Sequence, residues 1–450
     1  MNHNVKLGVL ILGRKRPGFD QEWGRQLEGV VREFLENSLY EALVPETATD
    51  DSSLRGSLAK CRENGCDVLI ALQPTMSDGR LAPVLAQQWS RPVILWALPE
   101  RPEGPPDALS NSLVGTHIFA SILRHLHHPF EVVYGDPREE RVQQALDEAV
   151  RLADASWRLG KSKVGLVGNH APGFIAMHAD PFEIATLLGT QMYHFAVHEL
   201  VDGANSQPEE AVREDVERVL EMGIPLENIS KEDLPVNSRL YLAMRQMVEM
   251  ENLDALAVRE WPELPNVIGQ WAYLAMLRLH TDGVPTAMEG DVDGALSCLT
   301  GQLLGLGPGY ISDWLEHDEE TITVWHMGNA PLEMSEPVGS RYGPRLARHF
   351  NISKPMVINA NLNPEKPITI MRLWRFDGEY RMMARDGQTV APQRELLGTN
   401  GVVRIEGANV YELFDELCHA GMPHHLTVFQ GHHSNLFRRF ARQTKVRWVE

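Results

Sequence analysis

The chain is poor in cysteine and contains no long apolar run, and both shortages exclude whole classes of protein. Its 4 cysteines among 450 residues do not make a disulfide framework, so we expect free thiols in a reducing compartment. No apolar stretch approaches the roughly 18 residues that a membrane-spanning helix needs. The N-terminus also lacks the basic start and apolar region of a signal peptide. We therefore expect a cytoplasmic protein.

Basic charge is also scarce. The 42 lysines and arginines are outnumbered by 61 acidic residues, which leaves a formal net charge of −19. Such a surface repels nucleic acid and anionic lipid, so we expect neither as a partner. No Gly-x-Gly-x-x-Gly follows the strand-like residues 6–13, and no Gly-x-Ser-x-Gly is present. The sequence therefore supports neither a dinucleotide cofactor nor a serine hydrolase.

The hydrophobic pattern divides the chain into three parts, as its length suggests. Residues 1–160 alternate short apolar runs such as 67–72 with helical patterns, which predicts an open parallel-sheet α/β domain. The same alternation over 161–345 predicts a second α/β domain. From 346 to 450, short β-like runs are separated by Asn, Pro, Gly and Asp. This pattern predicts a β-rich, barrel-like C-terminal domain.

Two acidic motifs stand out in the second part. The segment Trp261–Leu264 places Glu263 at the end of a strand-like run, between apolar neighbours, where a merely solvated carboxylate is unusual. Asp291 stands in Met288–Asp291, just before an apolar helical pattern. A helix cap would explain Asp291 alone, but three acids within residues 289–293 beside two glycines exceed what a cap requires. We therefore interpret Glu263 and Asp291 as functional carboxylates.

Histidines supply the remaining candidate ligand. His424 and His425 directly precede an apolar strand, and because strand side chains alternate, only one of the pair can easily point into a shared cavity. His326 and Asn329 lie at the end of another strand-like run and are candidate substrate contacts. Two carboxylates and an imidazole from distant parts of a chain suit a divalent metal that also holds an oxygen-rich substrate. Fe(II) oxygenases use a similar set, but their His-x-Asp/Glu pattern does not occur at a suitable site.

At these motifs, and in the segments 130–137, 164–168 and 171–174, the chain resembles the L-fucose isomerase and arabinose isomerase-like family of aldose–ketose isomerases. The resemblance covers nearly the whole length. It implies two α/β domains, a β-rich C-terminal domain, and homo-oligomers with active sites between subunits. It also implies a bound Mn²⁺, whose ligands fall on Glu263, Asp291 and His425. Other divalent metals remain open.

The resemblance further implies isomerisation through an enediol, with Glu263 and Asp291 also serving as general base and acid. Arg16, His326, Asn329 and His424 become the candidate substrate contacts. His424 stands where the fucose enzymes have Asn, which leaves the sugar open.

We expect a small aldose such as L-fucose or D-arabinose. The alternative is an anionic sugar such as sulfoquinovose, because Arg14, Lys15, Arg16, Arg80 and His424 offer positive charge. A non-catalytic sugar-binding protein is a further reading, against which the acidic pair argues.

Overall fold

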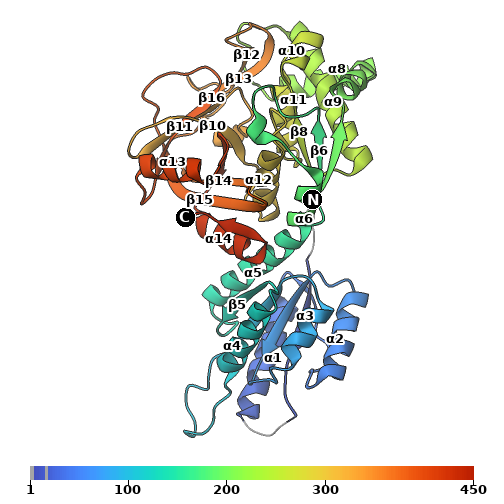
Figure 1. Cartoon of the computed structure of the whole chain (residues 1–450), viewed down its shortest axis with the longest axis vertical. Helices are drawn as coiled ribbons and strands as arrows, with labels where there is room; N and C mark the ends of the chain where they lie inside the picture. The colour runs from blue at the N-terminus through green and yellow to red at the C-terminus, as the bar shows by residue number, and fades with distance from the viewer. Residues whose placement is uncertain (1–4, 16–18) are drawn as a thin grey trace. The chain divides into compact units, whose positions relative to one another are not determined.

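The computed structural model of the chain describes residues 5–15 and 19–450 (Figure 1). The chain divides into two compact units. The first comprises residues 1–158 with 442–444, and the second comprises 159–441 with 445–450. No helix among the described residues is both long and apolar enough to cross a membrane.

Within the described residues, the first unit is built on a five-stranded parallel sheet with the order β2-β1-β3-β4-β5. Its strands are β1 (Lys6–Ile11), β2 (Glu41–Leu43), β3 (Val68–Gln73), β4 (Val93–Ala97) and β5 (Phe130–Tyr134). Its helices are α1 (Gln21–Asn37), α2 (Asp51–Glu63), α3 (Leu81–Gln88), α4 (Ser112–His125) and α5 (Glu140–Leu159).

Both faces of this sheet are covered. Side chains of a strand alternate between the faces, so Leu7, Val9 and Ile11 join one apolar cluster while Leu10 and Leu12 join another. Helices α1 and α5 contribute to the first cluster, and α2, α3 and α4 to the second. The near-continuous apolar strands of the sequence are explained by this burial on both sides.

The second unit begins with a smaller parallel sheet, ordered β7-β6-β8-β9. Its strands are β6 (Lys163–Val167), β7 (Gln191–Phe195), β8 (Ala255–Val258) and β9 (Thr286–Ala287). Its helices are α6 (Pro181–Leu187), α7 (Val197–Asn205), α8 (Glu209–Glu221), α9 (Leu234–Glu251), α10 (Glu263–Val267), α11 (Tyr273–Thr281) and α12 (Val292–Leu303). Short 3-10 turns lie at Ile175–Met177, Lys231–Asp233 and Leu332–Met334.

A barrel completes the second unit, drawn in tan to red in Figure 1. Strands β16, β11, β10, β17, β14 and β15 pair antiparallel in that order, and β15 pairs back to β16. The barrel strands are β10 (Tyr310–His317), β11 (Thr321–His326), β14 (Pro367–Phe376), β15 (Glu379–Val390), β16 (Thr399–Ile405) and β17 (His425–Gln430). The remaining elements are β12 (Arg345–Arg348), β13 (Pro355–Asn361), β18 (Val446–Trp448), α13 (Val410–His419) and α14 (Ser434–Gln443).

The predicted fold class is confirmed: parallel-sheet α/β regions are followed by a barrel-like sheet. That sheet takes its first strands from residues 310–326, earlier than the boundary at residue 346 that the sequence pattern suggests. Helix α12 is buried along most of its length and contacts both β8 of the small sheet and β14 of the barrel. The turn that leads into α12 is therefore positioned where the two sheets of the second unit meet.

Candidate metal centre

The turn between β9 and α12 carries the first carboxylate of the site. Glu289 adopts a left-handed backbone conformation, with φ of 60°. Its N–H donates to Glu260 Oε2 at 2.6 Å, and its carbonyl accepts from Ala171 N at 2.9 Å. Gly290 follows with φ of 71°, and a Cβ there would lie 2.2 Å from the carbonyl oxygen of Asn169. Only glycine fits at that position, so the turn holds Glu289 in one orientation.

Two barrel strands bring the next two groups together. Asp313 on β10 and His425 on β17 are directly opposite each other in the strand register. Residues opposite each other on antiparallel strands project from the same face, so both side chains point to the same side of the barrel wall. Asp313 Oδ1 lies 3.4 Å from His425 Nε2, and Glu289 Oε2 lies 3.5 Å from the same nitrogen.

The three atoms that converge here lack hydrogen-bond partners. Glu289 Oε2, Asp313 Oδ1 and His425 Nε2 are all buried and unpaired within the described residues. Their ligand atoms belong to two overlapping groups with metal-binding spacing, Glu289–His424–His425 and Asp313–His326–His425. Because an unpaired buried polar atom is costly, three of them aimed at one another fit the ligands of a cation. The second unit therefore contains a buried cluster with the chemistry to bind a divalent metal.

Asp291 lies behind the cluster and is held by partners on both carboxylate oxygens. Its Oδ1 accepts from Gly294 N at 2.9 Å, which caps α12, and Arg372 donates to both oxygens at 2.7 and 2.8 Å. His425 Nδ1 lies 2.9 Å from Oδ2. Both oxygens are thus already engaged. The geometry makes Asp291 the group that orients the His425 ring, as carboxylates commonly do behind a metal-binding histidine.

Burial sets the ionisation of the cluster. It raises the pKa of Glu289 and that of Asp313 to about 7 each, and it lowers the pKa of His425 to about 4. Burial also disfavours the charged form of Asp291, but the Arg372 charge together with the hydrogen bonds from His425 and Arg372 holds the pKa of Asp291 well below its usual value. His425 is therefore neutral near pH 7. With Nδ1–H directed at Asp291, its Nε2 lone pair is free to bind a metal.

Of the other site residues expected from the sequence, some lie at the cluster and one does not. Glu263 is not part of the cluster: it begins α10 and forms an ion pair with Arg259, with Arg259 Nε at 2.9 Å. His424 does join it, since its Nε2 lies 3.5 Å from Glu289 Oε2 and 3.6 Å from Asp313 Oδ1. His326 is buried with its Nε2 3.9 Å from Glu289 Oε1.

Asn329 and Arg16 are the two remaining residues that the sequence suggests as substrate contacts. Asn329 is fully buried, and in the part of the chain that the structure describes neither polar atom of its side chain has a partner. Arg16 lies outside the described residues, so its role stays a prediction.

The cluster draws on a segment that the sequence motifs single out, but with other side chains. Glu289 belongs to the motif that was recognised, yet its neighbour Asp291 was preferred. Asp313 was missed, although it is an acid within the otherwise uncharged start of a strand, Tyr310–Trp314, which is a usable signal. Glu260 was also missed; it is fully buried directly after β8, and burial raises the pKa of its carboxyl to about 8.

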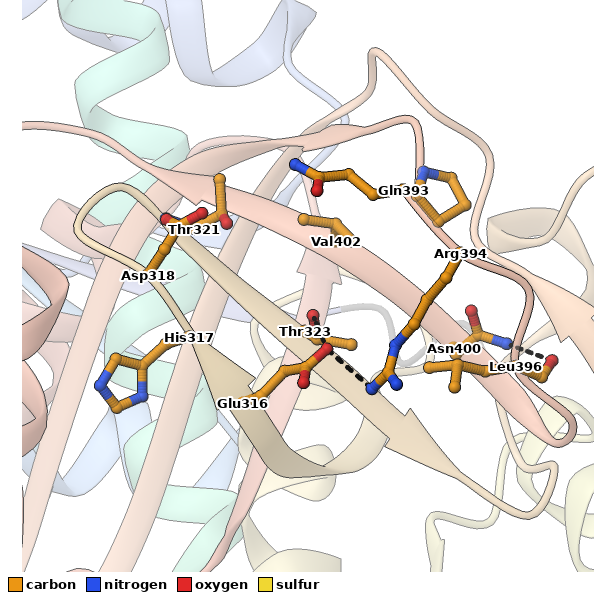
Figure 2. Close-up of a pocket in the computed structure, with 11 residues that line it drawn as sticks. Glu316, His317, Asp318, Thr321, Thr323, Gln393, Arg394, Leu396, Asn400 and Val402 are labelled. Carbon is orange, nitrogen blue, oxygen red and sulfur yellow. Dashed lines mark hydrogen bonds and ion pairs between the residues drawn. The ribbon is translucent and has the colours of Figure 1, made fainter.

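A separate pocket of about 390 Å³ lies beside β10, β11 and β16 (Figure 2). Its charged group Glu316 already accepts from Arg394 Nη2 at 3.0 Å and from Thr323 Oγ1 at 3.4 Å. The residues of the metal cluster do not line this pocket. The converging, unpaired atoms of the cluster therefore identify the functional site better than the size of this cavity does.

The chain is similar to known sugar isomerases. No family model matches the chain. It is 27% identical to the sulfoquinovose isomerase of Priestia aryabhattai, over 98% of this chain and 99% of that protein. The sulfoquinovose isomerase of Alkalicoccus urumqiensis is 26% identical over 80% of this chain and 81% of its own length. That of Clostridium sp. (strain MSTE9) is 28% identical over 81% and 82%.

Solved structures add nothing to this comparison. A periplasmic solute-binding protein of an ABC transporter from Actinobacillus succinogenes 130z, with bound D-allose, aligns with a TM-score of only 0.18 at 11% identity. The curated relatives do not identify the narrower L-fucose and arabinose isomerase family. Their shared name and their coverage of most of the chain support an enzyme of the aldose–ketose isomerase class, as the sequence motifs predict.

Proposed function

We propose that this protein is a metal-dependent aldose–ketose isomerase whose substrate is an anionic sugar such as sulfoquinovose. The observation that carries the proposal is the convergence of Glu289 Oε2, Asp313 Oδ1 and His425 Nε2, all buried and unpaired. The names of the relatives favour sulfoquinovose, the alternative in the sequence analysis, over L-fucose or D-arabinose.

Glu289, Asp313 and His425 would hold the metal. Two carboxylate oxygens and one imidazole nitrogen suit Mn²⁺ among the divalent cations. His424 can add a fourth ligand atom, a second nitrogen, since its Nε2 lies close to both carboxylates. When bound, such a cation acts as a Lewis acid that stabilises negative charge developing on the sugar oxygens.

The same two carboxylates are the best placed proton carriers. Isomerisation moves a proton between C2 and C1 of the sugar, which requires a base and an acid with pKa values near the working pH. In the cluster without a cation, burial raises the pKa of Glu289 and that of Asp313 to about 7 each, so both carboxyls accept a proton more readily than an exposed carboxyl does. Glu263 and Asp291 are less suited in this structure, because Arg259 engages the first and Arg372 the second.

Recognition of an anionic group was expected to use a set of basic side chains near the N-terminus. In the structure Lys15 is paired with Asp50, and Arg80 with Asp78. Arg14 lies over the ring of Phe19, with its Cζ 4.9 Å from the ring centroid. These residues belong to the first unit and the cluster to the second, so their part in binding the sugar stays a prediction.

An activity screen with controlled metal content tests the proposal. We expect ketose formation from sulfoquinovose that is abolished by EDTA and restored by Mn²⁺, with lower kcat/KM for L-fucose, D-arabinose, L-arabinose and D-galactose. Faster turnover of a neutral aldose would instead support the expectation from the sequence, a small aldose such as L-fucose or D-arabinose. Full activity after metal removal would refute the metal site, and sugar binding without any turnover would favour a binding protein.

Two wider predictions accompany this function. The resemblance of the motifs predicts a homo-oligomer with sites between subunits. Light scattering of the purified protein tests whether it is an oligomer. The composition predicts a cytoplasmic location, which cell fractionation tests.

A further inference from the structure

His326 holds its proton on the nitrogen that faces the cluster. The residue ends β11, and its side chain is buried. Its Nδ1 lies 2.9 Å from the backbone N–H of Met327, which donates to it. A neutral imidazole carries one hydrogen, and the nitrogen that accepts a hydrogen bond cannot carry it. The hydrogen of neutral His326 is therefore on Nε2.

His425 has the opposite arrangement. Its Nδ1 faces Asp291 Oδ2, and an ionised carboxylate only accepts hydrogen bonds, so this nitrogen must donate. The Nε2 of His425 is then unprotonated and able to bind a cation. The two rings lie 5.4 Å apart at an interplanar angle of 69°, so two neighbouring histidines present different atoms to one site. One presents a lone pair and the other an N–H.

The surroundings of His326 preserve this orientation. The ring of Tyr273 packs edge-on against it at 5.8 Å, and the Tyr273 hydroxyl donates to Glu260 Oε1 at 3.1 Å. His326 Nε2 is 3.9 Å from Glu289 Oε1, which is longer than a hydrogen bond. That oxygen already accepts from Trp261 Nε1 at 3.2 Å. The N–H is thus directed at the site without a close carboxylate acceptor.

We propose that His326 is a hydrogen-bond donor to an oxygen of the bound sugar and is not a metal ligand, although its position fits a ligand by distance alone. The claim that His326 donates to a sugar oxygen rests on the function proposed above. The claim that His326 is not a metal ligand does not depend on that function. Negative charge grows on the sugar oxygens during isomerisation. A fixed, buried N–H aimed at one of them stabilises that charge more than it stabilises the starting sugar.

Metal titration of three purified variants separates a donor from a ligand. In His326→Leu we expect Mn²⁺ affinity within about threefold of wild type and a kcat lowered roughly 10²-fold, the usual cost of losing one such donor. His326→Gln retains an amide N–H and should recover part of that kcat. His425→Gln is the matched control. Removing a group that lies behind a metal ligand lowers metal affinity by up to roughly 10²-fold, and we expect the loss of the ligand itself to exceed this.

Each outcome decides the inference. It is refuted if His326→Leu loses Mn²⁺ as His425→Gln does, or if His326→Leu keeps the wild-type kcat. Should the leucine variant fail to fold by circular dichroism, the glutamine variant carries the metal measurement. Wild-type protein that isomerises no sugar would refute the proposed function instead, and the metal titration would still show whether His326 is a ligand.

Discussion

A Glu289→Gln variant is expected to lose most of its bound metal and to isomerise its sugar ~10²–10⁴-fold more slowly than wild type, the range for loss of a proton-transferring group. Glu289 Oε2 is buried, unpaired and 3.5 Å from His425 Nε2. Glutamine has nearly the same shape but lacks the negative charge and one of the two acceptor oxygens. The metal content after dialysis and the kcat of the Mn²⁺-saturated variant measure the two losses separately.

Glu263→Gln is the matched control, because the sequence analysis places the ligand there. In the structure Glu263 pairs with Arg259 on a partly exposed helix start, and such pairs contribute roughly 0–1 kcal/mol to stability. We expect this variant to keep its metal and most of its turnover. If Glu263→Gln loses metal and Glu289→Gln keeps it, the assignment from the sequence motifs is right and the structural one is wrong.

The second large effect is expected at the buried ion pair behind the cluster. Arg372→Met should lower the free energy of unfolding by ~3–5 kcal/mol, because it leaves the Asp291 carboxylate buried without its cation. Arg372 and Asp291 side chains are each 1% exposed and are joined by two hydrogen bonds. Gly294 makes room for them, since a Cβ there would lie 2.3 Å from Asp291 Oδ2. Urea unfolding in the presence of EDTA measures this loss without a contribution from bound metal.

Arg404→Met provides the comparison for Arg372. Arg404 pairs with Glu320 at 3.5 Å on the surface of the same barrel, with side chains 54% and 72% exposed. Removing this exposed pair should change the free energy of unfolding by less than about 1 kcal/mol. Equal losses in the two variants would show that the Arg372–Asp291 pair is not the stabilising element that its burial indicates.

The acidic turn before α12 illustrates what a sequence pattern leaves open. Glu289, Asp291 and Asp293 are three acids at alternate positions, and any of them could serve as a ligand or as a cap. The left-handed conformation of Glu289 and the hydrogen bond from its N–H to Glu260 direct one carboxylate to the cluster. The next, Asp291, turns back to Arg372 and His425. None of these partners is near the turn in the sequence.

Local pattern alone determined the layered α/β and barrel classes, because apolar periodicity and turn residues act over a few neighbouring positions. It also singled out residues 288–291 and 424–425, from which Glu289, His424 and His425 join the cluster. Only the tertiary structure decided which atoms meet. Asp313 and His425 become neighbours through the pairing of β10 with β17, whereas Glu263 is paired with Arg259. Metal binding depends on distances between remote side chains, and those distances are set by strand register and burial.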